Sequence, residues 1–252
     1  MKILVCFKFI RDEEGISVNA DRTINLDSAR WVISPYDLNA IEAGMKLAAE
    51  AGESTVEVLT VGGEALDNSK MRKAVLSRGP VKMYGVKAGE CGDMYSTAVL
   101  LKGAIEKIGD ADLVICGEGS GDMYSQAMGN VLAALLNAAA VNSVEDLSFE
   151  DGAVYASRSS GKRVEKLKLN GPAVVSVTSD ICRPHIPSVK DIMAGGKKPA
   201  EVWVASEFGS VSAPVTTVSV LAPERTDRMQ TVFKASDETG IDEFVKALKK
   251  SI

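Results

Sequence analysis

Residues 117–125, read Gly-Glu-Gly-Ser-Gly-Asp-Met-Tyr-Ser, are the part of the sequence best suited to binding an anion. They follow a short apolar run and precede a helical pattern. The free peptide N–H groups and the dipole at a helix start favour a phosphate. The spacing matches neither G-x-G-x-x-G nor a Walker loop. A flexible turn between a strand and a helix would use the same residues, so both interpretations stay open on this pattern alone.

Two further segments also follow apolar runs. Ser34 is a capping residue, Pro35 takes the first helical position and Asp37 follows three residues after the cap, which predicts a helix start closed by a capping box. Gly62 and Gly63 end another run. Each segment alone is typical of an ordinary helix start or strand exit. Because all three segments follow strands of one predicted sheet, they can line one pocket at its carboxyl edge.

The loop at residues 183–189 is expected to be stiff and partly apolar, because it holds two prolines, and a short helix follows it. Exposed rigid apolar loops tend to be docking surfaces. The alternative is that its apolar side chains fold back on the core. His185 is expected at the surface rather than as a ligand. The partner-docking candidates are Ile186, Pro187, Val189, Ile192 and Met193.

Hydrolytic and metal chemistry have little support in the sequence. His185 is the only histidine, so a catalytic triad or a metal site would have to be built around it. The cysteines lack a C-x-x-C pair, which argues against zinc and redox motifs and favours free thiols. They are Cys6, Cys91, Cys116 and Cys182. A hydrolase is therefore not expected.

The composition is typical of a globular protein that folds in water. The 252 residues are 46% hydrophobic and 25% charged, and the net charge of −5 disfavours nucleic acid, which binds basic faces. No apolar run approaches the roughly 20 residues that a membrane span needs, and the opening run is too short for a signal peptide. A cytoplasmic location is expected.

The elements that would position these residues alternate between strand and helix. Four successive units predict a parallel sheet with right-handed crossovers and helices on both faces, a three-layer doubly wound α/β fold. Ligands of such sheets lie at the carboxyl ends of the strands. The predicted strands are 3–7, 56–61, 81–86 and 113–116, and the predicted helices are 34–51, 70–77, 94–108 and one through Met128, Leu132 and Leu135.

The remaining segments are less regular. Residues 11–33 predict an irregular excursion with a small hairpin, and residues 153–157 and 164–169 flank a hairpin turn ahead of a strand at 173–178. Residues 200–235 lack a clear period and are interpreted as an extended arm before a helix at 241–250. We therefore divide the chain into a nucleotide-binding α/β domain, 1–199, and a C-terminal arm, 200–252.

Several segments match, in order, the motifs of one family of α/β proteins. They are KILVCFK, SPYDLNAIEAGMKL, TVGG, KAVLSRG, DLVICGEGSGDMYSQAMG, GPAVVSVTSD and IPSVKDIMAGGKKP. Together they resemble the beta subunit of electron transfer flavoproteins, an adenine-nucleotide-binding fold. The sequence is most similar to the Fix-type branch of the family in the segments SPYDLNAIEA, VLSRGP and IPSVKDIM. That branch is associated with carnitine or acyl-CoA metabolism and anaerobic electron transfer.

The resemblance implies an electron carrier that pairs with an alpha subunit, on which the arm would pack, and that serves an acyl-CoA-type dehydrogenase or oxidoreductase. The redox FAD would be shared with the alpha subunit, and AMP or a second FAD would lie in this chain. Val189 would be the docking anchor. Tyr124 and Ala127 replace the family's second Asp and Gln. The implied nucleotide-binding residues are Cys6, Ser34, Pro35, Tyr36, Asp37, Gly62, Asp122, Met123, Tyr124, Ser125, Gln126, Met128, Gly129 and Leu132.

Two other classes of protein are alternatives to an electron transfer flavoprotein subunit. A free-standing ATP- or AMP-binding stress-type domain has the same architecture, but it would need neither the long arm nor the proline-rich loop. An adenylating enzyme would have an S-G-G-x-D-S-like loop after the first strand, where this chain has Cys-Phe-Lys-Phe at residues 6–9.

Overall fold

Seven parallel strands form the central sheet of the computed structural model, which describes residues 1–89, 93–209, 214–224, 230–237 and 239–251. Cys91 lies outside these residues. The strand order is β14-β7-β6-β1-β8-β13-β9. The strands are β1 (Lys2–Cys6), β6 (Thr55–Gly62), β7 (Lys82–Lys87), β8 (Leu113–Gly117), β9 (Ala139–Val144), β13 (Ala173–Val177) and β14 (Ala200–Val204).

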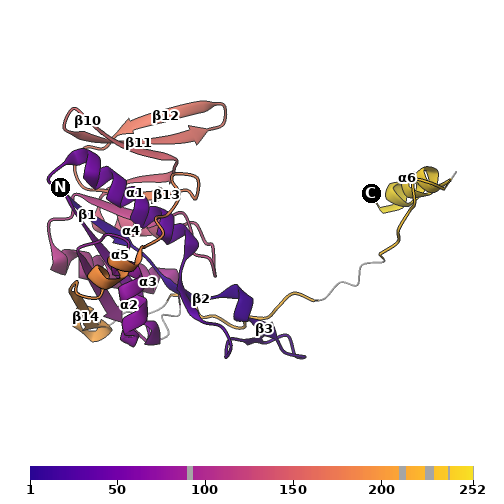
Figure 1. The fold of residues 1–252 in the computed structure, drawn as a ribbon, viewed down its shortest axis with the longest axis horizontal. Helices are drawn as coiled ribbons and strands as arrows, with labels where there is room; N and C mark the ends of the chain where they lie inside the picture. The colour runs from indigo at the N-terminus through magenta and orange to yellow at the C-terminus, as the bar shows by residue number, and fades with distance from the viewer. Residues whose placement is uncertain (90–92, 210–213, 225–229, 238, 252) are drawn as a thin grey trace.

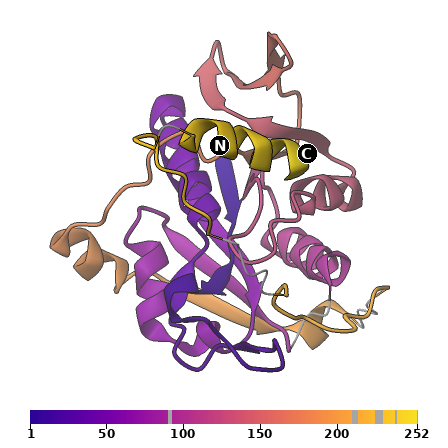
Figure 2. The same ribbon diagram turned by 90° about the vertical axis from the view of Figure 1, so that its right-hand side faces the viewer.

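Helices cover both faces of this sheet, which confirms the predicted three-layer α/β fold (Figures 1 and 2). Side chains alternate along each strand, so β1 sends Ile3 and Val5 to one core cluster and Leu4 to the other. The first cluster packs against α1 and α2, and the second against α3 and α4. The helices are α1 (Pro35–Ala51), α2 (Ser69–Leu76), α3 (Met94–Ile108), α4 (Met128–Leu136), α5 (Val189–Gly195) and α6 (Gly240–Ser251).

The excursion after β1 returns to the sheet edge through two small antiparallel pairs. Strand β2 (Phe9–Arg11) pairs with β5 (Trp31–Ile33), and β3 (Ser17–Val18) pairs with β4 (Ile24–Asn25). The second pair is the predicted small hairpin. Short 3-10 turns occur at Glu13–Gly15, Glu64–Asp67 and Ala205–Phe208.

A separate three-stranded antiparallel sheet stands at one end of the molecule (Figure 1). Strands β11 (Ala153–Ser160) and β12 (Arg163–Lys168) are the predicted hairpin, and β10 (Asp146–Glu150) adds a third strand. The buried Leu147 and Val154 join this sheet to the core on the α1 side. The small sheet therefore belongs to the body of the protein.

The arm begins later than the sequence indicates. Strand β14, interpreted as the start of the arm, pairs in parallel with β7 and closes one edge of the central sheet. Only Trp203 is buried in this strand, where it stacks on Tyr84 at 5.2 Å between ring centroids. An edge strand with one buried residue has almost no hydrophobic period, so its pattern resembles that of a loop.

Beyond β14 the chain leaves the body beside β3, with α6 at its far end (Figure 1). The arm is held at its base, where Ala222 N–H donates to Arg22 O at 2.9 Å and Arg22 forms an ion pair with Glu224. Helix α6 exposes a large part of its apolar side chains, with Ile241 63% exposed and Phe244 48% exposed. The division into a domain and an arm that packs on a partner stays a prediction.

Helix α5 packs directly on the end of α2, and one glycine makes this possible. A Cβ at residue 195 would lie 2.6 Å from the peptide N of Ser77, whereas a Cβ at residue 196 would meet only the flexible end of Lys73 at 3.5 Å. Lys198 Nζ adds hydrogen bonds to the carbonyls of Leu76 and Gly79 at 3.0 and 2.8 Å. The segment before α5 is thus fixed to the body at its C-terminal end.

We expect Gly195→Ala to lower the free energy of unfolding by about 1–3 kcal/mol, because the added methyl group overlaps backbone that cannot move aside. Gly196→Ala is the matched control and should change stability by less than about 0.5 kcal/mol. Urea unfolding of both variants measures the difference. Equal stabilities would show that α5 can move away from α2 without cost.

Candidate functional site

The carboxyl ends of β1 and β8 meet the start of α1 at one edge of the sheet. The Asp37 carboxylate accepts the peptide N–H of Lys8 at 2.7 Å and also that of Gly117. A Cβ at residue 117 would lie 2.6 Å from Asp37 Oδ1, so only glycine fits there. Ser34 Oγ accepts the Gly121 peptide N–H at 3.3 Å. These contacts hold the loop after β1, the start of α1 and the glycine-rich loop after β8 side by side.

Asp37 is buried, and burial is the main influence on its charge. Desolvation raises the pKa of the Asp37 carboxyl to about 7, against hydrogen bonds from Lys8, Gly117 and Ser34 that lower it. The capping box predicted from the sequence is wrong. Ser34 is the N-cap, but its side chain caps no helix N–H group. The Ser34 side chain instead accepts a hydrogen bond from Gly121, and the Asp37 side chain accepts one from Lys8, so both hold neighbouring loops. Pro35 at the first helical position is confirmed, and the helix ends at Gly52, whose φ of +77° favours glycine.

Lys8 supplies the positive charge of the site. Its Nζ lies 2.6 Å from Asp122 Oδ2 in the glycine-rich loop. Partial burial raises the pKa of Asp122, but hydrogen bonds from Lys8 and Ser120 and the charge of Lys8 outweigh it and leave the pKa below its usual range. The ion pair between Lys8 and Asp122 therefore connects the loop after β1 to the loop after β8.

Tyr124 lies over the glycine-rich loop in a strained conformation. Its φ is +42°, and that of Gln126 is +53°, both in the left-handed region that favours glycine. The Tyr124 ring packs on Tyr36 with centroids 5.0 Å apart, and a Cβ at residue 119 would lie 2.5 Å from that ring. Gln126 Nε2 donates to Tyr124 Oη at 3.3 Å. The two tyrosines form one aromatic surface at the carboxyl edge.

Helix α4 begins at Met128, after Ala127, which has no side chain that can cap it. The peptide N–H groups of Met128, Gly129 and Asn130 therefore have no acceptor within the helix. Such donors fit a phosphate, and the helix dipole favours its charge. Ser125 lies three residues before the helix, and its Oγ is directed to Met94 Sδ at 3.7 Å. The helix donors thus begin three residues after Ser125.

Two of the predicted nucleotide residues belong to the core beneath the site. Leu132 is fully buried, and Cys6 lies beside Cys116 on the next strand. The hydrogen bond with Cys116 and burial raise the pKa of the Cys6 thiol well above its usual range. Cys6, Cys116 and Cys182 are free thiols, as expected. Gly62 ends β6 at the same sheet edge, where its carbonyl accepts the Ala88 peptide N–H.

The loop before α5 is exposed, and its apolar side chains do not fold back on the core. Ile186 is 87% exposed and Val189 is 76% exposed. Ile192 and Met193 also expose large apolar areas, whereas Pro187 is half-buried. The predicted short helix is α5, and its capping box pairs Ser188 with Asp191.

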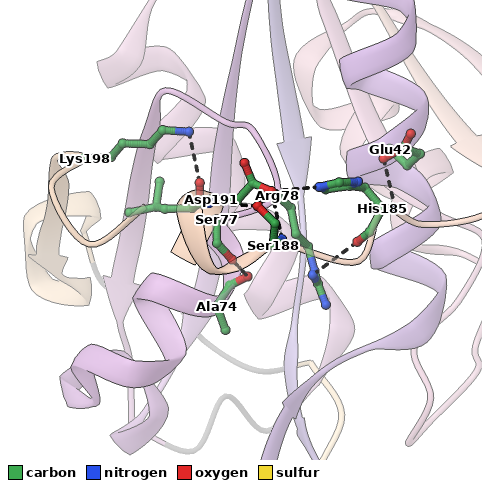
Figure 3. A network of polar contacts seen from close by, with 9 residues as sticks. Glu42, Ala74, Ser77, Arg78, His185, Ser188, Asp191 and Lys198 are labelled. Atoms are coloured by element: carbon green, nitrogen blue, oxygen red, sulfur yellow. Dashed lines mark hydrogen bonds and ion pairs between the residues drawn. The ribbon is translucent and has the colours of Figure 1, made fainter. Parts of the chain in front are cut away.

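Polar contacts hold this loop to the body (Figure 3). Asn39 of α1 donates to the carbonyls of Ser179 and Cys182 at 3.0 and 2.7 Å. His185 contacts Glu42 of α1 through its peptide N–H and Arg78 through its carbonyl. The apolar tip is thus displayed on a fixed base.

Sequence reasoning missed the residues that tie these loops together. Lys8, Asn39 and Arg78 were not singled out, because a single Lys, Asn or Arg in a loop or helix has many ordinary roles. Lys8 had one usable signal, since it follows β1 directly and so lies at the carboxyl edge. Asn39 and Arg78 act on a loop more than 100 residues later, which no local pattern reveals.

A family model described as the electron transfer flavoprotein domain matches residues 22–208, which include α1, α4 and the loop before α5. The chain belongs to this family. Electron transfer flavoproteins carry electrons and work with other electron-transfer proteins, and the family is associated with flavin. Among the described residues, no helix has the length and apolar character needed to cross a membrane.

The burial of Asp37 makes the stability of this electron transfer flavoprotein pH-dependent. Between about pH 4 and pH 7 the folded chain keeps a proton on Asp37 that the unfolded chain has lost, so stability falls as pH rises. We expect this group to contribute a slope of up to about 1.4 kcal/mol per pH unit. Asp37→Asn should remove that contribution.

Urea unfolding at a series of pH values checks this expectation. Asp27→Asn, at an exposed position, is the control and should keep the slope of the unsubstituted chain. Identical slopes in all three proteins would contradict a raised pKa at Asp37, whatever the absolute stability of the Asn variant.

Proposed function

We propose that this chain is the beta subunit of an electron transfer flavoprotein and that it functions in the cytoplasm as a heterodimer with a larger alpha subunit. The observation that carries the proposal is the combination of an electron transfer flavoprotein domain with apolar surfaces displayed away from the core. A protein complete in itself gains nothing from exposing Ile186, Val189 and Phe244. The similarity of several sequence segments to the Fix-type branch supports a role in carnitine, acyl-CoA or anaerobic metabolism.

The redox group in this proposal is an FAD held mainly by the alpha subunit. When bound, the flavin accepts and passes on electrons singly or as a hydride, so this chain needs no catalytic side chains of its own. Its part is to hold the flavin domain, bind a nucleotide and dock the dehydrogenase. No group of three or more His, Cys, Asp or Glu side chains in the described part of the chain is arranged to hold a metal.

The nucleotide site that we propose lies at the start of α4, where the donors fit a phosphate. Met128, Gly129 and Asn130 provide peptide N–H groups there. Tyr36 and Tyr124 provide aromatic surface at the same sheet edge, where an adenine ring could stack. Asp122 does not compete for the anion through free negative charge, because Lys8 balances it. AMP, or the AMP part of a second FAD, fits this set of groups.

The partner surface that we propose is the loop before α5, which we call the docking segment and define as residues 183–193. Its tip offers Ile186 and Val189 to an apolar pocket, and Lys190 and Lys197 nearby form no ion pair with any residue that the structure describes. An acyl-CoA-type dehydrogenase or another oxidoreductase is the partner that this function requires. The arm and α6 would pack on the alpha subunit.

A free-standing ATP- or AMP-binding stress-type domain remains the alternative function. It would use the same phosphate donors at α4 and the same sheet. It gives no reason for an amphipathic helix beyond a long arm, nor for a stiff loop whose Val189 is 76% exposed. The exposed surfaces therefore favour the flavoprotein subunit.

The chain expressed alone is expected to be colourless, and the complex with its alpha subunit yellow, because the alpha subunit holds most of the FAD contacts. Absorbance in the flavin band and identification of the released nucleotides measure both. A stoichiometric flavin on the isolated chain would favour a second FAD over AMP in this subunit. Failure of the two chains to co-purify would contradict the heterodimer.

The isolated chain is expected to bind AMP, although less tightly than a site with the family's second Asp, because main-chain donors remain while side-chain contacts are lost. Ser125→Glu should weaken binding about tenfold, since about 1.4 kcal/mol of charge repulsion corresponds to that factor. Ser125→Gln has nearly the same size without the charge and serves as control. Calorimetry measures both, and no heat at millimolar AMP would mean that the loop is purely structural.

A further inference from the structure

His185 lies where three elements of the protein meet (Figure 3). Its peptide N–H donates to Glu42 Oε2 at 3.1 Å, and its carbonyl accepts Arg78 Nη1 at 3.4 Å. Its ring Nε2 lies 3.3 Å from Asp191 Oδ2. The only histidine of the chain thus joins α1, the end of α2 and α5 through separate atoms.

One carboxylate oxygen of Asp191 accepts the hydrogen bonds at the other end of the docking segment. Its Oδ2 accepts the Ser188 peptide N–H at 2.8 Å and the Ser188 hydroxyl at 2.7 Å, besides facing the His185 ring. Hydrogen bonds from Ser188 and then from His185 lower the pKa of Asp191 to about 2, so the carboxylate is charged at neutral pH. A charged acceptor strengthens each of these hydrogen bonds.

These contacts enclose the exposed tip of the docking segment. His185 comes directly before Ile186, and Asp191 follows two residues after Val189. The tip side chains are largely exposed, so core packing contributes little to ordering them. Pro187 restricts the backbone between the two ends, and Pro184 restricts it directly before His185. The contact that closes the tip across its two ends is the one between the His185 ring and the Asp191 carboxylate, beside the hydrogen bonds that Asp191 accepts from Ser188.

We propose that His185 and Asp191 are positioning residues that close the docking segment into its binding shape before a partner arrives. The inference rests on the proposed docking function and extends it to residues that need not touch the partner. A loop already ordered loses less conformational entropy on binding, so the closure should appear as affinity for the partner. The rate of electron transfer within the formed complex should not depend on it.

The test compares His185→Ala and Asp191→Ala with His185→Gln, which keeps a side-chain N–H donor. Amide hydrogen exchange of the full chain reports order in the docking segment. The complex with the alpha subunit is then assayed with an acyl-CoA dehydrogenase, reduced by its acyl-CoA substrate, as the electron donor. Val189→Asp in the same assay tests docking independently, because it places a charge at the apolar tip without removing the closure.

Both alanine variants should exchange amide hydrogens about tenfold faster at residues 186–193, with exchange in β1 and β8 unchanged. Both should raise the KM for the dehydrogenase about fivefold with kcat nearly unchanged. His185→Ala should also leave the melting temperature nearly unchanged, whereas Asp191→Ala additionally removes the capping box of α5. His185→Gln should restore most of both properties. A merely structural role would alter the melting temperature and would not separate KM from kcat.

Unchanged exchange in both alanine variants would overturn the inference, because other contacts would then order the segment. Faster exchange with an unchanged KM would also overturn it, provided that Val189→Asp raises the KM, since docking would then not need the closure. An unchanged KM in Val189→Asp is a separate result. It would remove the docking function itself and, with it, the role proposed for the closure.

Discussion

The buried carboxylate of Asp37 is the contact on which the carboxyl edge of this protein depends. It accepts peptide N–H groups from Lys8 after β1 and from Gly117 at the end of β8, and it stands in the first turn of α1. Without this carboxylate, the peptide N–H groups at the ends of these two neighbouring strands would be buried without an acceptor. Each unpaired group would cost about 1–3 kcal/mol. One side chain therefore sets the positions of three chain segments. Gly117 must be glycine because that carboxylate fills the space beside it.

The phosphate donors of α4 are placed by the same arrangement. Ser34 holds the glycine-rich loop through the Gly121 peptide N–H, and Lys8 holds it through Asp122. With the loop held at these two adjacent residues, the left-handed conformations of Tyr124 and Gln126 persist, because surrounding contacts compensate for their strain. The helix then starts without a side-chain cap at the sheet edge. The main-chain donors that we propose for a phosphate would thus be positioned by the side chains of Ser34 and Lys8.

Much of the fold could be predicted from the sequence, because apolar runs such as residues 56–61 alternate with helical stripes such as 94–108. Strand β14 could not, because an edge strand with one buried residue has no period to read. The capping box at Ser34 failed for a different reason. Local capping rules do not include the distant N–H groups of Lys8 and Gly121, whose hydrogen bonds engage the same side chains.

The candidate site was predictable in position but only partly in its contacts. The rule that parallel strands meet at one edge brought residues 34–37 and 117–125 together correctly. It did not distinguish Cys6 and Leu132, which are core, from Lys8, which faces the loop. Alternation along β1 decides this, since Leu4 and Cys6 point to one face and the chain then leaves the sheet.

The carboxyl edge of the sheet and the docking segment obey opposite physical rules. At the carboxyl edge, polar groups are buried and paired, so the site is rigid and tolerates few substitutions. In the docking segment, apolar groups are exposed and only the polar base is paired, so the tip can change with little effect on stability. A carrier that meets different proteins requires both properties. The joining residues belong to the body and bond only backbone: Arg78 reaches the carbonyl of His185 in the docking segment, and Asn39 reaches the carbonyls of Ser179 and Cys182 just before it. This leaves the identity of the tip side chains free.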